Sequence, residues 1–171
     1  MINLLVKALQ FAEHKHRFQQ RKDPTHAPYI KHLIDVLSIL ANEANISDIN
    51  VLCAGLLHDT IEDTDTTAEE IRIIFGDVIM NLVLELTDDK SLPKQTRKEL
   101  QVAHAGQASY NAKLVKLADK IANLRDMKIN APENWEQSRV DEYFTWSKRV
   151  VDQLRGTHDG LEKLFDSAFT R

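Results

Sequence analysis

The spacing of the apolar residues limits the fold of this chain more than any other feature. They recur at intervals of three and four along most of the 171 residues, and no segment sustains the two-residue alternation of a half-buried strand. Only five glycines and four prolines are present, so few positions interrupt a helix. We therefore predict an all-α fold, and the length suits a single domain that spans residues 1–171.

The expected helices follow from apolar stripes and from residues that begin or end a helix. Pro28 suits a first helical turn, Thr66 or Thr67 offers a capping box with Glu69 or Glu70, and Gly76 is a plausible stop. The expected helical segments are Leu4–Ala12, Pro28–Leu40, about 48–58, a stretch opened by Thr66 or Thr67, Val78–Leu86, Asn111–Leu124, and a last long helix from near Pro132 that Gly156 ends.

Composition excludes several classes of protein. The net charge of −4 argues against general nucleic-acid binding, and no apolar run approaches the roughly 20 residues needed to cross a bilayer. The first residues lack the pattern of a secretory leader, so we expect a cytoplasmic protein. The single cysteine, Cys53, has apolar neighbours and reads as a small buried hydrophobe.

The most informative polar motif follows an apolar run. His58 and Asp59 come directly after it, and Glu62 and Asp63 lie about one helical turn later. An imidazole and a carboxylate that converge can bind a divalent metal, and neighbouring carboxylates can orient or deprotonate a water whose pKa the cation has lowered. A second pair, His158–Asp159, has no apolar run before it and no acidic pair after it, so we assign it to the surface.

Two further side chains could complete the set of ligands. His32 and Asp119 each lie in an expected helix with apolar neighbours. Simpler explanations exist for both, since His32 could be an ordinary helix histidine and Asp119 could pair with Lys116 or Lys120 on the surface. The acidic run 62–65 could likewise be a solvated loop and cap. The context favours a metal-dependent hydrolase.

One basic segment stands out in this acidic chain. Residues 14–22 contain four Lys and Arg residues and no acid, and they end in Arg21 and Lys22. Taken alone, these cations suit the C-terminal dipole of a solvated helix. Their proximity to His32 in the sequence makes a functional role the alternative.

Several motifs in order carry a family resemblance. The chain resembles the HD superfamily of metal phosphohydrolases, and within it the hydrolase domain of RelA/SpoT proteins in the stand-alone small alarmone hydrolase form, of the metazoan SpoT homologue type. The resemblance implies a single HD-domain helical bundle. The matching blocks are Arg21–Pro24, Pro28–Ile30 with His32, Leu56–Thr64, Thr87–Lys90, Lys113–Asp119 with Asn123 and Leu124, and Arg139–Val140 with Glu142–Phe144.

The resemblance also implies a reaction and a set of site residues. The reaction is the hydrolysis of guanosine 3′,5′-bis(diphosphate), or its pentaphosphate relative, to GDP or GTP and pyrophosphate, which ends the alarmone signal of the stringent response. The implied metal is manganese (Mn2+), although zinc or iron also suits such ligands. The metal ligands would be His32, His58, Asp59 and Asp119, the catalytic pair Glu62 and Asp63, and the substrate contacts Arg21, Lys22, Lys94, Asn123, Arg139 and Tyr143.

Other functions fit the same residues. The same metal chemistry could act on another phosphorylated nucleotide, including the 2′-phosphate of NADPH. A sensor that binds the alarmone without turnover is an alternative of another class, but pure binding does not require the Glu62–Asp63 pair. A purely structural helical protein would leave all the coincident motifs to chance. The sequence leaves the oligomeric state open, and we expect a small-molecule substrate with no nucleic-acid or membrane partner.

Overall fold

The computed structural model describes residues 2–170, and in that range the regular structure is helical, apart from an isolated β-bridge between Gln20 and Pro28. The all-α prediction is confirmed. In chain order the helices are α1 (Ile2–His16), α2 (Ile30–Ser38), the π-helix η1 (Ile39–Glu43), α3 (Ile49–Leu57), α4 (Thr60–Asp63), α5 (Ala68–Phe75), α6 (Asp77–Leu86), α7 (Lys94–Ala105), α8 (Tyr110–Ile129), α9 (Gln137–Asp152) and α10 (Asp159–Phe169).

Helix α3 lies in the interior of the bundle. Residues 51–57 are all buried, and the helix packs against α1, α2, α6 and α8. A helix that is apolar on every side must be covered on every side. Gly55 permits the close approach of the α2–η1 segment, because a Cβ atom at this position would lie 2.8 Å from Cδ1 of the buried Leu40. The carboxyl end of α3 is thereby fixed next to α2.

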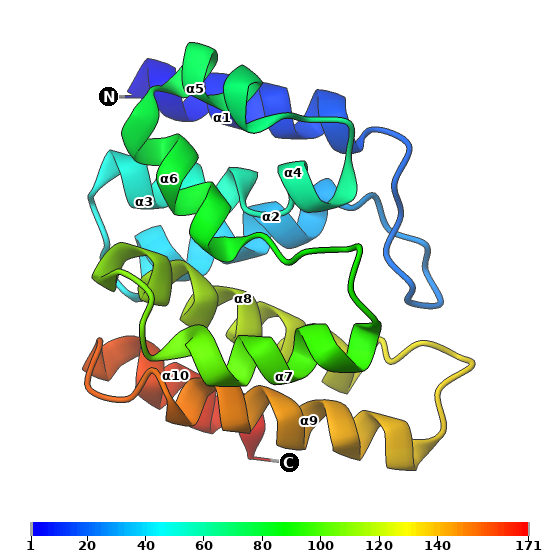
Figure 1. Ribbon diagram of the computed structural model, residues 1–171. Coiled ribbons are helices and arrows are strands. Elements are labelled where there is room, and N and C mark those ends of the chain that lie inside the picture. The colour runs from blue at the N-terminus through cyan, green and yellow to red at the C-terminus, as the bar shows by residue number, and fades with distance from the viewer. Residues whose placement is uncertain (1, 171) are drawn as a thin grey trace.

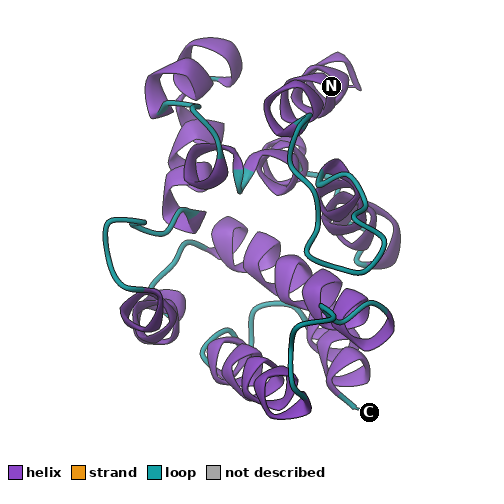
Figure 2. Cartoon of the chain, turned by 90° about the vertical axis from the view of Figure 1, so that its right-hand side faces the viewer, coloured by secondary structure: helices purple, strands orange, loops and turns teal. Residues whose placement is uncertain are grey.

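Helix α8 joins the two parts of the molecule. In Figure 1 it runs between an upper group, which includes α1 to α6, and a lower group formed by α7, α9 and α10. Figure 2 shows the same long helix crossing the middle of the molecule. It contacts α2, α3 and α6 on one side and α9 and α10 on the other, while α7 packs on α9. A side chain near the middle of α8 can therefore meet residues of α2 and α3.

Several expected helix boundaries are confirmed. The side chain of Asp48 accepts a hydrogen bond from the backbone N–H of Asn50 at the start of α3, and Thr67 accepts one from Glu70 at the start of α5. Gly76 ends α5 with a φ of 88°, a conformation that glycine adopts without strain. Cys53 is fully buried, as its apolar neighbours indicate.

Other features of the fold were not predicted. Helix α7 was missed, since its sequence is largely polar and Ala105 is its one residue classed as buried. Helix α10 was missed as well; it begins at the His158–Asp159 pair, where the His158 ring caps the helix by accepting the N–H of Leu161. The helix expected from near Pro132 begins at Gln137, because residues 132–135 form a turn closed by a 2.9 Å hydrogen bond.

Among the described residues, no helix combines the length and the apolar character that crossing a membrane requires.

Candidate metal centre and active site

Three helical segments bring two imidazoles and two carboxylates together. His32 lies on α2, His58 and Asp59 lie between α3 and α4, and Asp119 lies on α8. His32 Nε2 is 3.2 Å from Asp119 Oδ1 and 3.8 Å from Asp59 Oδ2. His58 Nε2 is 3.1 Å from Asp59 Oδ2 and 3.7 Å from Asp119 Oδ1. Four side chains from three separate segments of the sequence therefore converge on one point.

The surroundings of His58 fit a bound cation. Its Nδ1 lies 2.9 Å from the carbonyl oxygen of Gly55, which can only accept, so Nδ1 carries a proton. In a neutral ring, Nε2 then presents a lone pair towards the two carboxylates. This buried Nε2 has no hydrogen-bond partner. A lone pair facing carboxylate oxygens is unfavourable by itself and becomes favourable when a cation lies between them, which is the usual arrangement of a histidine ligand.

The two carboxylates are held by groups outside the cluster. The Tyr29 hydroxyl donates to Asp59 Oδ2 at 2.6 Å, and the Asn123 amide donates to Asp119 Oδ1 at 2.6 Å. Lys120 Nζ lies 3.1 Å from Asp119 Oδ2. Burial alone would raise the pKa of Asp119, but the neighbouring Lys120 ammonium holds it well below its usual range. Asp119 is thus kept ionised and available as a ligand.

The pairing of Asp119 differs from the surface arrangement weighed as an alternative. Lys120 is only 4% exposed, and its ammonium lies over the Trp146 ring, 4.4 Å from the centroid. A buried ammonium of this kind is stabilised by its carboxylate partner and by the face of the indole. Asp119 and Lys120 therefore form an interior pair beside the cluster.

The acidic pair lies on α4 at the edge of the cluster. Glu62 Oε2 accepts the backbone N–H of Asp88 at 3.0 Å, and Glu62 Oε1 is 3.5 Å from the Arg97 guanidinium. Burial, followed by the neighbouring charge of Asp88, raises the pKa of Glu62. Asp63 accepts hydrogen bonds from Gln19 at 3.2 Å and from Lys90. Both carboxylates border the same cavity of about 190 Å³ as the cluster.

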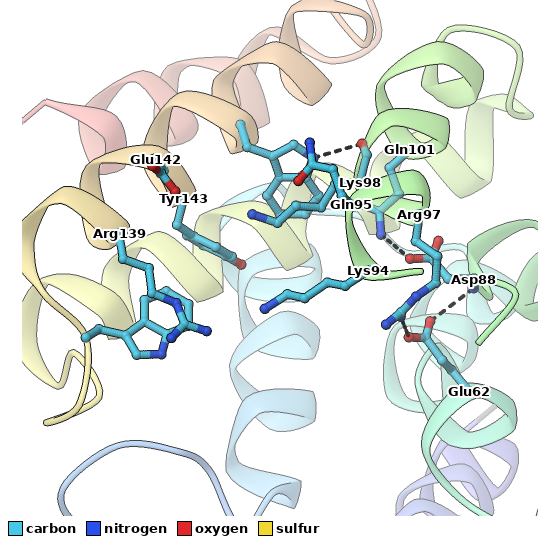
Figure 3. A pocket seen from close by; sticks show the side chains of 12 residues that line it. Glu62, Asp88, Lys94, Gln95, Arg97, Lys98, Gln101, Arg139, Glu142 and Tyr143 are labelled. Atoms are coloured by element: carbon cyan, nitrogen blue, oxygen red, sulfur yellow. Dashed lines mark hydrogen bonds and ion pairs between the residues drawn. The ribbon is translucent and has the colours of Figure 1, made fainter. Parts of the chain in front are cut away.

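A basic cavity opens between α7 and α9 next to Glu62. Its volume is about 460 Å³, and its cations are Lys94, Arg97 and Lys98 of α7 and Arg139 of α9. Figure 3 shows the Lys94 side chain extending between Arg139 and Arg97, which lies beside Glu62. Burial and the nearby cations lower the pKa of Lys94. Cations that crowd in this way are stabilised by an anionic ligand.

Aromatic rings form one wall of the basic cavity. The Arg139 guanidinium lies over the Trp135 ring at 4.1 Å, and Lys94 lies over the same ring at 5.9 Å. Tyr143 contacts both Trp135 and Trp146. The predicted substrate contacts Lys94, Arg139 and Tyr143 therefore line the same cavity.

A second cavity, of about 470 Å³, lies by the loop after α1. Arg21, Lys22 and Tyr143 line it, and Tyr143 also lines the first cavity. Arg21 donates to Asp126 at 2.7 and 3.2 Å and to Asn123 Oδ1 at 3.2 Å. Asn123 thus links Arg21 to Asp119, because its amide oxygen accepts from Arg21 and its amide nitrogen donates to Asp119.

Some residues of the site carry no signal in the sequence that marks them as functional. Asp126 lies 105 positions from Arg21, so the pattern of either segment gave no sign of the ion pair. Arg97 lies on a helix that was not predicted, and Trp135 falls at the start of the last expected helix, where no site residue was predicted. Tyr29 belongs to a matched sequence block, but a role for its hydroxyl depends on the distance to Asp59.

Comparison with known proteins extends over nearly the whole chain. The sequence profile of the HD domain family matches residues 8–144. Guanosine-3′,5′-bis(diphosphate) 3′-pyrophosphohydrolase MESH1 of Drosophila melanogaster is 52% identical over 164 residues, which are 96% of this chain and 92% of the relative. The Homo sapiens protein of the same name is 54% identical over 165 residues, with 96% and 92% covered. A solved structure described as a metazoan ortholog of SpoT that hydrolyses ppGpp has a TM-score of 0.95 and 52% identity, covering 97% of this chain and 93% of that chain.

Proposed function

The chain belongs to the HD domain family, and we propose that it is a metal-dependent guanosine-3′,5′-bis(diphosphate) 3′-pyrophosphohydrolase. The observation that carries the proposal is the convergence of two imidazoles and two carboxylates beside an acidic pair, in a chain similar to relatives of that name over nearly its whole length. The substrate would be a small guanine nucleotide with a diphosphate on its 3′ oxygen.

The proposed metal ligands are His32, His58, Asp59 and Asp119. Two imidazole nitrogens and two carboxylates form a donor set that manganese accepts, and we propose manganese as the native metal. When bound, the cation lowers the pKa of a water and offsets charge that develops on the attacked phosphorus. The orphaned Nε2 of His58 supports the assignment.

We assign the removal of the water's proton to the acidic pair. Glu62 is half-buried and its pKa is raised, which suits a group that must accept a proton near neutral pH. Its orientation is set by the Asp88 N–H, while Asp63 is held by Gln19 and Lys90. The water oxygen bonds to the phosphorus that is attached to the 3′ oxygen. The bond between this phosphorus and the 3′ oxygen breaks, and the 3′ oxygen receives a proton. Pyrophosphate and GDP leave.

The cations around the site would bind the diphosphates. Lys94 and Arg139 line the α7–α9 cavity, and Arg21 and Lys22 line the cavity by the loop after α1. Arg can contact two phosphate oxygens at once, and Lys supplies a mobile charge. Arg21 is oriented by its ion pair with Asp126. Asn123 donates to Asp119 and accepts from Arg21, so it helps to hold both side chains in place. We propose that it also contacts the ribose of the substrate.

The products distinguish this function from related ones. Metal-stripped protein is incubated with guanosine tetraphosphate, with and without manganese, and the products are separated by chromatography. We expect pyrophosphate and GDP in equal amounts only when manganese is present. Orthophosphate as the main product, or equal turnover without metal, would contradict the proposal. NADPH in a parallel incubation tests the alternative substrate, which would release orthophosphate.

A further inference from the structure

A buried histidine near the site has no part in the proposed chemistry. His16 is the last residue of α1 and is 2% exposed, so it cannot contact a substrate. Its ring stacks on the Tyr29 ring, with centroids 5.0 Å apart and an interplanar angle of 25°. The Tyr29 hydroxyl in turn donates to Asp59. His16 thus lies directly behind residues that shape the site.

The His16 ring is also connected to the catalytic pair through an amide. Its Nδ1 lies 2.6 Å from Oε1 of Gln19, and Nε2 of Gln19 lies 3.2 Å from Oδ2 of Asp63. An ionised carboxylate can only accept hydrogen bonds, so the Gln19 amide must turn its nitrogen towards Asp63. Its oxygen then faces His16 and can only accept. Asp63 therefore fixes both the orientation of the Gln19 amide and a proton on Nδ1 of His16.

The backbone around Gln19 restricts the amide further. Gln19 N donates to the His16 carbonyl at 2.9 Å, and Tyr29 N donates to the Gln19 carbonyl at 2.9 Å. The other oxygen of Asp63 is bonded to Lys90, whose side chain is 48% exposed. A solvated lysine holds a carboxylate weakly. The interior contact from Gln19 is therefore the one that sets the direction of Asp63.

The protonation of His16 is consistent with this arrangement. Burial lowers the pKa of His16, so its ring is neutral at pH 7. With the proton on Nδ1, the buried Nε2 has no hydrogen-bond partner. The ring thus makes its one polar contact through Nδ1, at the cost of leaving its other nitrogen unsatisfied.

We propose that His16 is a positioning residue for Asp63 and acts through Gln19. The Nδ1–H of His16 holds the Gln19 amide, and the amide N–H of Gln19 holds the Asp63 carboxylate towards the cluster. The inference rests on the proposed function for the role of Asp63, whereas the hydrogen-bonded chain itself does not depend on any substrate.

The tautomer of His16 gives a test that needs no activity. Two-bond ¹H–¹⁵N spectra of the protein loaded with diamagnetic magnesium distinguish a proton on Nδ1 from one on Nε2, and the His16→Asn variant identifies the His16 signals. We expect the Nδ1–H form, although free neutral imidazole side chains favour Nε2–H. An Nε2–H signal for His16 would overturn the proposal.

Kinetics of guanosine tetraphosphate hydrolysis test the positioning role. His16→Phe keeps the stacked ring and removes the donor, and Gln19→Glu keeps the shape but places a carboxylate against Asp63. We expect each variant to lower kcat about tenfold, with KM within about twofold, because Gln19→Glu removes a hydrogen bond to the charged Asp63 and His16→Phe frees the amide that makes this bond. His16→Asn presents an amide N–H near the position of Nδ1–H and should recover most of kcat. His14→Phe, on the exposed side of α1, is the matched control and should leave kcat unchanged.

The double variant His16→Phe/Gln19→Glu separates positioning from folding. If His16 acts through Gln19, the double variant loses no more kcat than Gln19→Glu alone. Multiplied losses, equal losses in His16→Phe and His16→Asn, or an unchanged kcat in Gln19→Glu would overturn the proposal. Should His16→Phe fail to fold, Gln19→Glu alone still tests the hydrogen bond between Gln19 and Asp63. A wild-type protein without turnover would refute the proposed function and leave the tautomer result as the test of the His16–Gln19–Asp63 geometry.

Discussion

Removal of one hydroxyl should weaken the metal centre. Tyr29→Phe deletes the group that donates to Asp59 Oδ2 at 2.6 Å and leaves the ring in place against His16. Burial, followed by the charge of Asp59, raises the pKa of Tyr29 well above its usual value, so the hydroxyl is a donor throughout the neutral range. The substitution removes one hydrogen bond and little else.

The size of the effect follows from the kind of bond. A hydrogen bond to an ionised carboxylate contributes about 1.5–3 kcal/mol, and groups that orient metal ligands typically contribute about 10- to 100-fold in metal affinity. We expect Tyr29→Phe to weaken manganese binding by about 10- to 100-fold, because the released Asp59 carboxylate can turn away from the cluster. Its kcat at saturating manganese should fall less than its affinity for the metal.

The assay combines metal binding with turnover. Manganese affinity is measured by isothermal titration calorimetry, and hydrolysis of guanosine tetraphosphate is followed across a manganese titration. Tyr110→Phe is the matched control, since Tyr110 is 57% exposed and lines none of the three cavities described above. A Tyr29→Phe affinity within about twofold of wild type, in a protein of unchanged thermal stability, would refute the reasoning.

Glu62, Lys94 and Gly55 each give a further prediction. Glu62→Gln should lower kcat by about 100-fold or more while sparing manganese affinity, and equal losses of affinity and kcat would contradict the role of Glu62. In the wild type, kcat should fall as the pH is lowered through the raised pKa of Glu62, since protonation removes the proton acceptor. Lys94→Met should raise KM for guanosine tetraphosphate about tenfold while Lys148→Met does not, and equal effects would count against the basic cavity as the phosphate site. Gly55→Ala should lower the free energy of unfolding in urea by about 1 kcal/mol, because the steric clash of the new Cβ atom with Leu40 outweighs the gain in helix propensity. A more stable variant would show that the Leu40 side chain moves to avoid the clash.

The sequence was most informative where local pattern decides structure. Apolar spacing and capping residues located α3, α5 and most of α8, and the apolar run before His58 indicated that the pair ends a buried helix. Convergence with His32 and Asp119 was suggested by the family resemblance, because spacing alone left ordinary helix and surface roles open.

The missed features have different physical causes. Helix α7 is polar on most sides and packs mainly on α9, so its pattern carries no strong apolar stripe. Helix α10 does have apolar residues at helical spacing, including Leu161, Phe165 and Ala168, but the His158–Asp159 pair at its start was assigned only to the surface and no helix was expected there. The ion pair of Arg21 with Asp126 depends on how distant segments pack, which local pattern does not determine.

The central claim is that one cation is held by two imidazoles and two carboxylates. A crystal structure of the manganese-loaded protein, with anomalous data collected at the manganese edge, locates that ion directly. We expect one strong anomalous peak in contact with His32, His58, Asp59 and Asp119. A peak at another site, or its absence from crystals of protein whose turnover depends on manganese, would contradict it.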